Sequence, residues 1–173
     1  AIQHVTLCYS GGGNPPQPPP PHSGGGDPPP RRVFEGPQAD ALLSALADYD
    51  YVYVSGISLA ILTAGGRERL MQALSLARAA GTRIVFDNNY RPHLWPDVHA
   101  ARQAYSDMLR LTDLALITWE DDAALFGYAD HTELFRAYKA FGVGEIALKR
   151  GAASCLIQCA AGHVEVPAEH VQH

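Results

Sequence analysis

The sequence predicts an α/β fold in which a parallel, Rossmann-type β-sheet is flanked by helices. Short runs rich in β-branched and apolar residues, such as 51–54, 83–86 and 113–118, alternate with longer segments of helical periodicity. The intervals between the runs are long enough for right-handed β-α-β crossovers. Polar and charged residues gather directly after the runs, where open parallel sheets bind ligands. We therefore expect the site at the carboxyl ends of the strands.

Two elements come before the strand at 51–54. Residues 1–9 alternate loosely between apolar and polar side chains, which predicts a strand. We expect this strand to be cut off from its partner strands. Residues 37–47 are predicted to form a helix, because Leu42, Leu43 and Leu46 then share one face.

The strand at 51–54 leads to Gly56, which allows the backbone either to turn sharply or to approach a ligand closely. The clearest helix follows at 67–80, and Gly81 suits the position just after a helix. Its predicted core face consists of Leu70, Met71, Leu74, Leu76 and Ala77. Later helices are predicted at 96–111, before Gly127 and at 131–141, and later strands at 145–149, 155–159 and 163–166.

Composition favours a soluble globular protein. With 47% hydrophobic and 18% charged residues and a net charge of -5, the 173-residue chain can bury a core but offers no basic face for nucleic acid. No apolar run is long enough to span a membrane. Three scattered cysteines without a CxxC pair predict a reducing, cytoplasmic location. The eight histidines are interpreted as surface or incidental residues rather than metal ligands.

A proline- and glycine-rich run divides the chain. Residues 11–30 hold nine of the thirteen prolines and six of the sixteen glycines, so they cannot form a helix interior or a central strand. We therefore predict a residual strand at 1–10, a disordered loop at 11–31 and a partial α/β domain at 32–173. The run could dock an SH3-like or WW-like module, although an inserted low-complexity segment is the simpler interpretation.

The most polar stretch, residues 87–91 (DNNYR), directly follows the strand at 83–86. It can be an ordinary Asx-type turn or a binding site at the end of a strand, and composition leaves both open. Arg91 can bind a carboxylate or a phosphate through two parallel hydrogen bonds.

Two further polar clusters follow later strands. Glu120, Asp121 and Asp122 fall in the first turn of a helix, where they can offset the helix dipole or surround Mg²⁺ through oxygens and waters. Residues 149–152 can hold anionic phosphates or form a solvated basic bend. Neither a GxxxxGK[ST] loop nor a GxGxxG fingerprint is present, so no P-loop or standard dinucleotide site is indicated.

Three segments, 53–62, 86–95 and 148–152, closely resemble 2-keto-3-deoxygluconate kinases, which are sugar-acid kinases of the ribokinase (PfkB-type) family. The resemblance extends from about Arg32 to Glu169. It implies a ribokinase-like fold and ATP-dependent phosphorylation of a hydroxyl group on a 2-keto-3-deoxy acid, with Mg²⁺. The implied partners are a small-molecule sugar acid and ATP, and a full-length member could form a homo-oligomer.

The resemblance also implies roles for individual residues. Arg91 would contact the substrate and the transferring phosphoryl group, with Asn89 and Tyr90 beside it. Gly56 would lie on the substrate side, and Tyr9 matches the tyrosine that opens a substrate-contacting segment.

The remaining implied residues bind the nucleotide and its metal ion. Asp121 would act on Mg²⁺ indirectly, through water or phosphate. Thr118 replaces the asparagine that the family has at this position. The implied nucleotide-binding residues are Asn89, Thr118, Lys149, Arg150, Gly151, Ala152 and Ser154.

Two parts of the family pattern lack a counterpart in this sequence. The resemblance implies a catalytic aspartate in a Gly-Ala-Gly-Asp-like motif, which this sequence does not contain, and the segment after Tyr9 is interrupted. We therefore expect a central fragment of a kinase that does not transfer phosphate by itself. The alternatives are a non-catalytic α/β module with a proline-rich partner-docking segment and, less well supported, another nucleotide-binding α/β enzyme such as a sugar-nucleotide epimerase.

Overall fold

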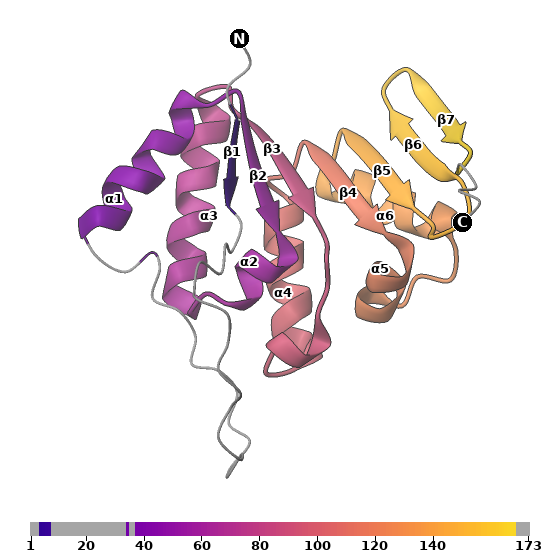
Figure 1. Cartoon of the computed structure of the whole chain (residues 1–173), viewed down its shortest axis with the longest axis horizontal. Helices are drawn as coiled ribbons and strands as arrows, with labels where there is room; N and C mark the ends of the chain where they lie inside the picture. The colour runs from indigo at the N-terminus through magenta and orange to yellow at the C-terminus, as the bar shows by residue number, and fades with distance from the viewer. Residues whose placement is uncertain (1–3, 8–33, 35–36, 169–173) are drawn as a thin grey trace, which may run out of the picture.

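The computed structural model describes residues 4–7, 34 and 37–168, which contain a seven-stranded sheet with helices packed against it (Figure 1). Strands β1 to β5 are parallel, and β6 and β7 continue the sheet as an antiparallel hairpin. The predicted fold class is therefore confirmed. The strands are β1 (His4–Leu7), β2 (Tyr51–Ser55), β3 (Arg83–Asp87), β4 (Leu114–Thr118), β5 (Glu145–Lys149), β6 (Cys155–Cys159) and β7 (Gly162–Val166).

Helices fill the connections between the parallel strands. They are α1 (Pro37–Ser44), α2 (Gly56–Ala60), α3 (Ala64–Ala79), α4 (Val98–Leu109), α5 (Trp119–Phe126) and α6 (His131–Phe141). Short 3₁₀ turns at Ala45–Asp48 and Pro92–Leu94 follow α1 and precede α4. The side chains of Thr63, Asp97 and Asp130 each accept a hydrogen bond from the amide three residues later, which fixes where α3, α4 and α6 begin.

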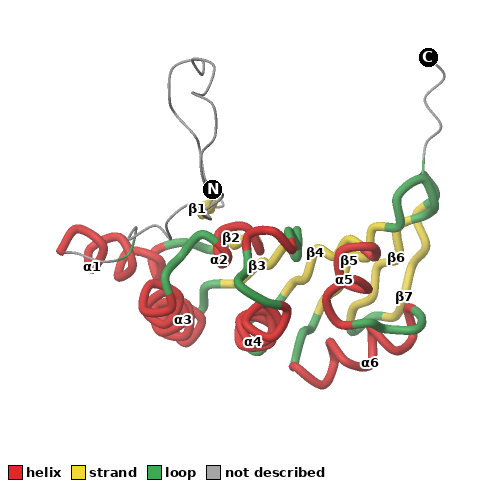
Figure 2. Tube along the Cα trace, turned by 90° about the horizontal axis from the view of Figure 1, so that it is seen from below, coloured by secondary structure: helices red, strands yellow, loops and turns green. Residues whose placement is uncertain are grey.

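The strand order explains why three long helices share one side of the sheet. The strands lie in chain order without a reversal, so successive right-handed crossovers place their helices on the same side. Figure 2 shows α3, α4 and α6 together below the sheet. We call this side the covered face. Along β2, β3 and β4 its strand residues are fully buried, with exposed fractions of 0% at Val52, Ile84, Phe86, Ala115 and Ile117.

The opposite side of the sheet, which we call the open face, carries the alternate residues of the same strands. Tyr53, Leu116 and Ala147 are only partly buried. Ile157 and Val164, which pair across β6 and β7, are 38% and 60% exposed. Parallel sheets usually have both faces buried. In β2 to β5, the covered face meets that expectation at every position, and the open face meets it only at Ser55 and Val85.

Three predictions need correction. The strand at the start of the chain is not cut off from partners, because β1 pairs in parallel with β2 from His4 to Leu7. Leu42 was expected to share a face with Leu43 and Leu46, which are buried, but is 46% exposed, and Leu76 was expected in the core but is 73% exposed. In α3 the positions that face the sheet are taken by Leu70, Leu74 and Ala77, which are spaced four and three residues apart, and Leu76 points away from them.

The predicted loop at 11–31 and the candidate Tyr9 lie outside the described residues. Among the residues that are described, no helix combines the length and the apolar character needed to cross a bilayer.

Candidate functional site

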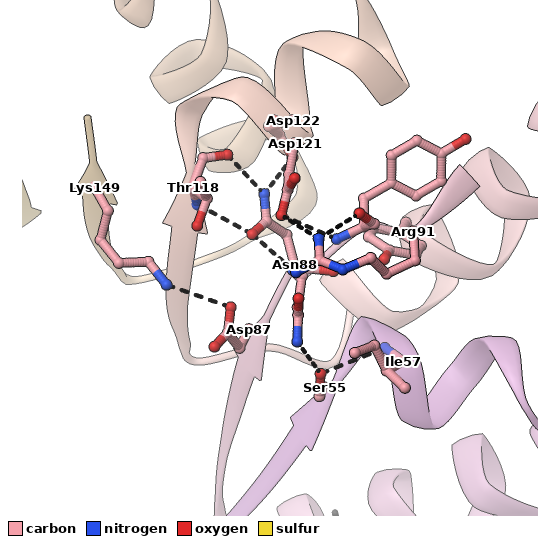
Figure 3. Close-up of polar contacts among 12 residues, drawn as sticks. Ser55, Ile57, Asp87, Asn88, Arg91, Thr118, Asp121, Asp122 and Lys149 are labelled. Carbon is pink, nitrogen blue, oxygen red and sulfur yellow. Dashed lines mark hydrogen bonds and ion pairs between the residues drawn. The ribbon is translucent and has the colours of Figure 1, made fainter. Parts of the chain in front are cut away.

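The carboxyl ends of β3 and β4 bring together the residues that sequence analysis selected (Figure 3). The guanidinium Nη1 of Arg91 lies 3.4 Å from Oδ2 of Asp121, and the same oxygen accepts a hydrogen bond from the Tyr90 amide at 3.2 Å. Arg91 Nη1 also donates to the Tyr90 carbonyl at 2.8 Å. The Arg91 side chain is 43% exposed, so it is oriented by these contacts yet accessible from solvent.

Asn89 joins this loop to the neighbouring strand β2. Its φ of 31° is in the left-handed region, which asparagine tolerates better than most residues. Its side-chain amide donates to Ser55 Oγ at 3.3 Å. Ser55 Oγ also accepts from the Ile57 amide and thereby caps α2. The loop is therefore linked to the start of α2 as well as to α5.

Lys149 reaches the same edge of the sheet from the end of β5. Its Nζ lies 3.5 Å from Oδ1 of Asp87, and Tyr53 Oη donates to the other Asp87 oxygen at 2.9 Å. Strand pairing aligns Thr118 with Lys149, so Thr118 lies at the same level. Side chains alternate along a strand, which puts these groups on the open face.

Arg150 and Ser154 form a separate group at the turn between β5 and β6. Arg150 Nε donates to the Ser154 carbonyl at 2.8 Å, and its Nη2 lies 2.6 Å from Glu165. The Ser154 hydroxyl hydrogen-bonds both of these charged side chains. Gly151 and Ala152 belong to the same turn, and the φ of Gly151 is 59°. The Arg150 charge is thus already paired within the hairpin.

Gly56 packs beneath the loop. A Cβ at this position would lie 1.9 Å from the Asn88 carbonyl oxygen and 2.0 Å from Tyr105 Oη, so only glycine fits without a shift of its neighbours. The close approach that Gly56 makes here is to the backbone of the chain itself. Its role as a substrate contact stays a prediction.

Asn88 was not among the predicted site residues, yet it is fully buried at the centre of the loop. Its side-chain oxygen accepts hydrogen bonds from the Asn89 amide at 2.8 Å and the Thr118 amide at 3.0 Å. Its side-chain nitrogen donates to the Thr118 carbonyl at 3.0 Å. The Tyr105 hydroxyl donates to the Asn88 carbonyl at 2.5 Å. The alternation of side chains in an extended strand was the signal for it, because Ile84, Phe86 and the next such position after β3, Asn88, fall on one face.

Asp122 is the second residue whose position the sequence did not reveal. It is fully buried, and its Oδ1 accepts hydrogen bonds from Tyr138 Oη at 2.7 Å and from the Asn88 side chain at 3.5 Å. Its Oδ2 has no hydrogen-bond partner. Burial raises the pKa of Asp122 to about 7, although the bonds from Tyr138 and Asn88 oppose that rise. Burial likewise raises the pKa of the Tyr138 hydroxyl.

The acidic side chains of Asp121 and Asp122 at the start of α5 are held by contacts within the chain. In the described part of the chain, no three His, Cys, Asp or Glu side chains are grouped so that they could hold a metal. Asp121 already accepts bonds from Arg91 and Tyr90. That Asp121 acts on Mg²⁺ indirectly, through water or phosphate, stays a prediction.

Comparison with known protein families and sequences matches most of the chain. The model of the pfkB family carbohydrate kinase matches residues 27–172. A protein of Dickeya dadantii named 2-dehydro-3-deoxygluconokinase is 46% identical over 135 residues, which are 78% of this chain and 44% of that protein. The protein of the same name from Escherichia coli K12 is 44% identical over the same share of each chain. This chain therefore spans less than half the length of these relatives.

Solved structures share the fold. A PfkB protein from Polaromonas sp. JS666 has a TM-score of 0.69 and 27% identity over 75% of this chain and 44% of its own. The aminoimidazole riboside kinase of Salmonella enterica, complexed with its riboside and an ATP analog, has a TM-score of 0.62 at 20% identity, over 70% of this chain and 40% of its own. An Escherichia coli structure in complex with ATP and Mg²⁺ has a TM-score of 0.64 at 23% identity, over 75% and 41%. The predicted ribokinase-like architecture is confirmed.

Proposed function

The chain belongs to the pfkB family of carbohydrate kinases, and we propose that it forms part of an ATP-dependent kinase that phosphorylates a hydroxyl group of 2-keto-3-deoxygluconate (2-dehydro-3-deoxygluconate). Support for this substrate comes from the relatives of that name at 46% and 44% identity. Because the chain spans 44% of their length, the activity is proposed for the longer protein to which these residues correspond.

The observation that carries the proposal is the contact between Arg91 and Asp121 at the carboxyl edge of the sheet, 3.4 Å apart. The guanidinium is accessible and can bind an anionic group through two hydrogen bonds. A sugar acid has a carboxylate and ATP has phosphates, so each ligand carries an anionic group that Arg91 can bind. Asn89 and Tyr90 would border the substrate from the same loop.

The nucleotide would lie towards the end of β5. Thr118 and Lys149 face the same side there, with the turn 150–154 beside them. Lys149 is 48% exposed and pairs with Asp87 at 3.5 Å, a long contact that a phosphate could replace. Mg²⁺ bound with ATP would neutralise charge on the phosphates. Asp121 would orient the waters of that ion.

Binding and phosphoryl transfer can be tested separately. Isothermal titration of the 173-residue chain with ATP and Mg²⁺, and separately with 2-keto-3-deoxygluconate, should show binding of both. Arg91→Ala should weaken binding of the sugar acid at least about tenfold, because a charged hydrogen-bond donor is lost. The matched control is Arg110→Ala, which removes another exposed arginine, paired with Asp107 near the end of α4.

Two results would contradict the proposal: no binding of either ligand to a folded chain, or equal effects of the two arginine substitutions. An assay for ADP release should show no turnover above a control without protein, because the base that the resemblance implies is not among these residues. The alternative of a non-catalytic docking module is not favoured, since the family match covers residues 27–172.

A further inference from the structure

Two buried residues connect the two parts of the candidate site, which are the loop after β3 and the start of α5, and neither residue faces a ligand. Asn88 and Asp122 are both 0% exposed, yet both are polar, and the large majority of buried polar groups in proteins make hydrogen bonds. Asn88 follows β3 and Asp122 lies in the first turn of α5. Their side chains meet, with Asn88 Nδ2 lying 3.5 Å from Asp122 Oδ1.

We propose that Asn88 and Asp122 are positioning residues, which hold the 89–91 loop against the start of α5 so that Arg91 and Asp121 face one ligand together. The identity of that ligand rests on the proposed function, whereas the positioning can be measured without any ligand.

The Asn88 side chain has four contacts that together fix the two strand ends. It accepts from the amides of Asn89 and Thr118, and it donates to the Thr118 carbonyl and to Asp122. Its own backbone is bound on both sides, because its amide donates to the Leu116 carbonyl and its carbonyl accepts from Tyr105. Removal of the side chain would leave the Asn89 and Thr118 amides without their acceptor, whereas the backbone bond to Leu116 would remain.

Asp122 acts on the neighbouring residue of its helix. Successive residues in an α-helix point about 100° apart, so a side chain held inwards at 122 turns the one at 121 outwards. The inward anchor is Tyr138 of α6, whose hydroxyl donates to Asp122 at 2.7 Å. Asp121 therefore points outwards, where it accepts a hydrogen bond from the Tyr90 amide and pairs with Arg91. Asp122 therefore orients Asp121 without touching the ligand side.

Amide hydrogen exchange in the whole 173-residue chain, resolved by NMR, tests this. Asn88→Ala should accelerate exchange of the Asn89 and Thr118 amides at least about tenfold, because both lose their acceptor. Asp122→Leu should accelerate exchange of the Tyr90 amide, whose acceptor is Asp121. Amides in the middle of α3 serve as the internal reference and should not change.

Two matched variants separate positioning from general destabilisation. Thr112→Val removes a buried hydroxyl that donates to the Met108 carbonyl at 2.9 Å, at the end of α4 far from the loop. It should leave exchange at 89, 90 and 118 unchanged relative to α3. Asp122→Asn keeps an oxygen for Tyr138 and Asn88, so it should restore exchange at Tyr90 to within about twofold of the original chain.

The proposal is overturned if Asn88→Ala accelerates amide exchange in the loop no more than in α3. It is also overturned if Asp122→Asn accelerates exchange of the Tyr90 amide as much as Asp122→Leu does. If Asn88→Ala does not fold, Tyr138→Phe replaces it: removing only the hydroxyl should accelerate Tyr90 exchange severalfold, and no acceleration would also overturn the proposal. Absence of ligand binding by the original chain would count against the proposed function but not against the exchange result.

Discussion

Ile84 and Phe86 of β3, and Asn88 just after it, point to the covered face and are fully buried, whereas Asp87 and the following Asn89 point to the open face and are partly exposed. The same division holds at the other strand ends, where Thr118 and Lys149 face the open side. The covered face thus holds the packing and the buried hydrogen bonds, and the open face holds the polar groups that can meet a ligand. One strand supplies both because its side chains alternate.

The largest expected difference in stability is between shortening an apolar side chain on the covered face and shortening one on the open face. Phe86→Ala should lower the free energy of unfolding by about 3–5 kcal/mol, because it empties a site where the ring also packs edge-on against Tyr105. The ring centroids are 5.3 Å apart. Leu116→Ala, on the open face, should cost only about 1 kcal/mol. Urea unfolding measures both, and equal losses would mean that the two faces are equally covered.

The pH dependence of stability should come from the covered side. The pKa of Asp122 rises from an ordinary value of 3.8 to about 7 on folding, so the folded chain binds more protons than the unfolded chain between these values. Stability should therefore fall as pH rises from 4 to 7, by up to about 4 kcal/mol at 1.36 kcal/mol per unit of pKa, and not fall further above it. Urea unfolding at several pH values measures this fall. Asp122→Asn should flatten the dependence; an unchanged slope in that variant would refute this assignment.

Glycine substitutions compare a crowded position beneath the loop with an open one. Gly56→Ala should destabilise by about 1–3 kcal/mol, because the new methyl group collides with the Asn88 carbonyl and Tyr105. Gly65→Ala, where a Cβ meets nothing within 4 Å, should be neutral or slightly stabilising. Thermal unfolding monitored by circular dichroism distinguishes them. Similar melting temperatures for both variants would contradict the packing described for Gly56.

The smallest effect on stability concerns the exposed part of the open face. Ile157→Lys and Val164→Lys should each change the free energy of unfolding by less than about 0.5 kcal/mol. They should nevertheless reduce self-association in sedimentation, because apolar side chains on an exposed sheet promote contacts between copies. Leu42→Lys on α1 is the control, since this leucine is 46% exposed away from the sheet. A reduction as large in the control would show that the open face has no special role.

Most of the fold could be predicted from the sequence because the signals were local. The bounds of α6 and β5 agree with the prediction, since Asp130 and Gly142 mark the two ends of α6. Leu76 was misplaced because a count of apolar residues does not say which of them face the sheet. That choice depends on the packing of α3 as a whole, where Leu70 and Leu74 occupy the inner positions.

The candidate site was predictable only in part. Arg91 and Asp121 were identified as charged residues after strands, and the parallel sheet brings them together. Asp122 and Tyr138 could not be paired from the sequence, because their contact depends on how α6 packs against α5. Side-chain alternation after Ile84 and Phe86 would have predicted that Asn88 is buried. The polar run 87–91 was instead interpreted through its exposed residues.

The chain-order arrangement of the strands also bears on how this polypeptide reaches its native state. Each parallel strand pairs with the one synthesised just before it, from β1 and β2 through β4 and β5. Among the described strands, pairing therefore joins strands that are neighbours in the chain, which keeps the mean sequence separation of contacts low for a parallel sheet. A nascent chain can add one β-α unit at a time to an already formed edge as it leaves the ribosome.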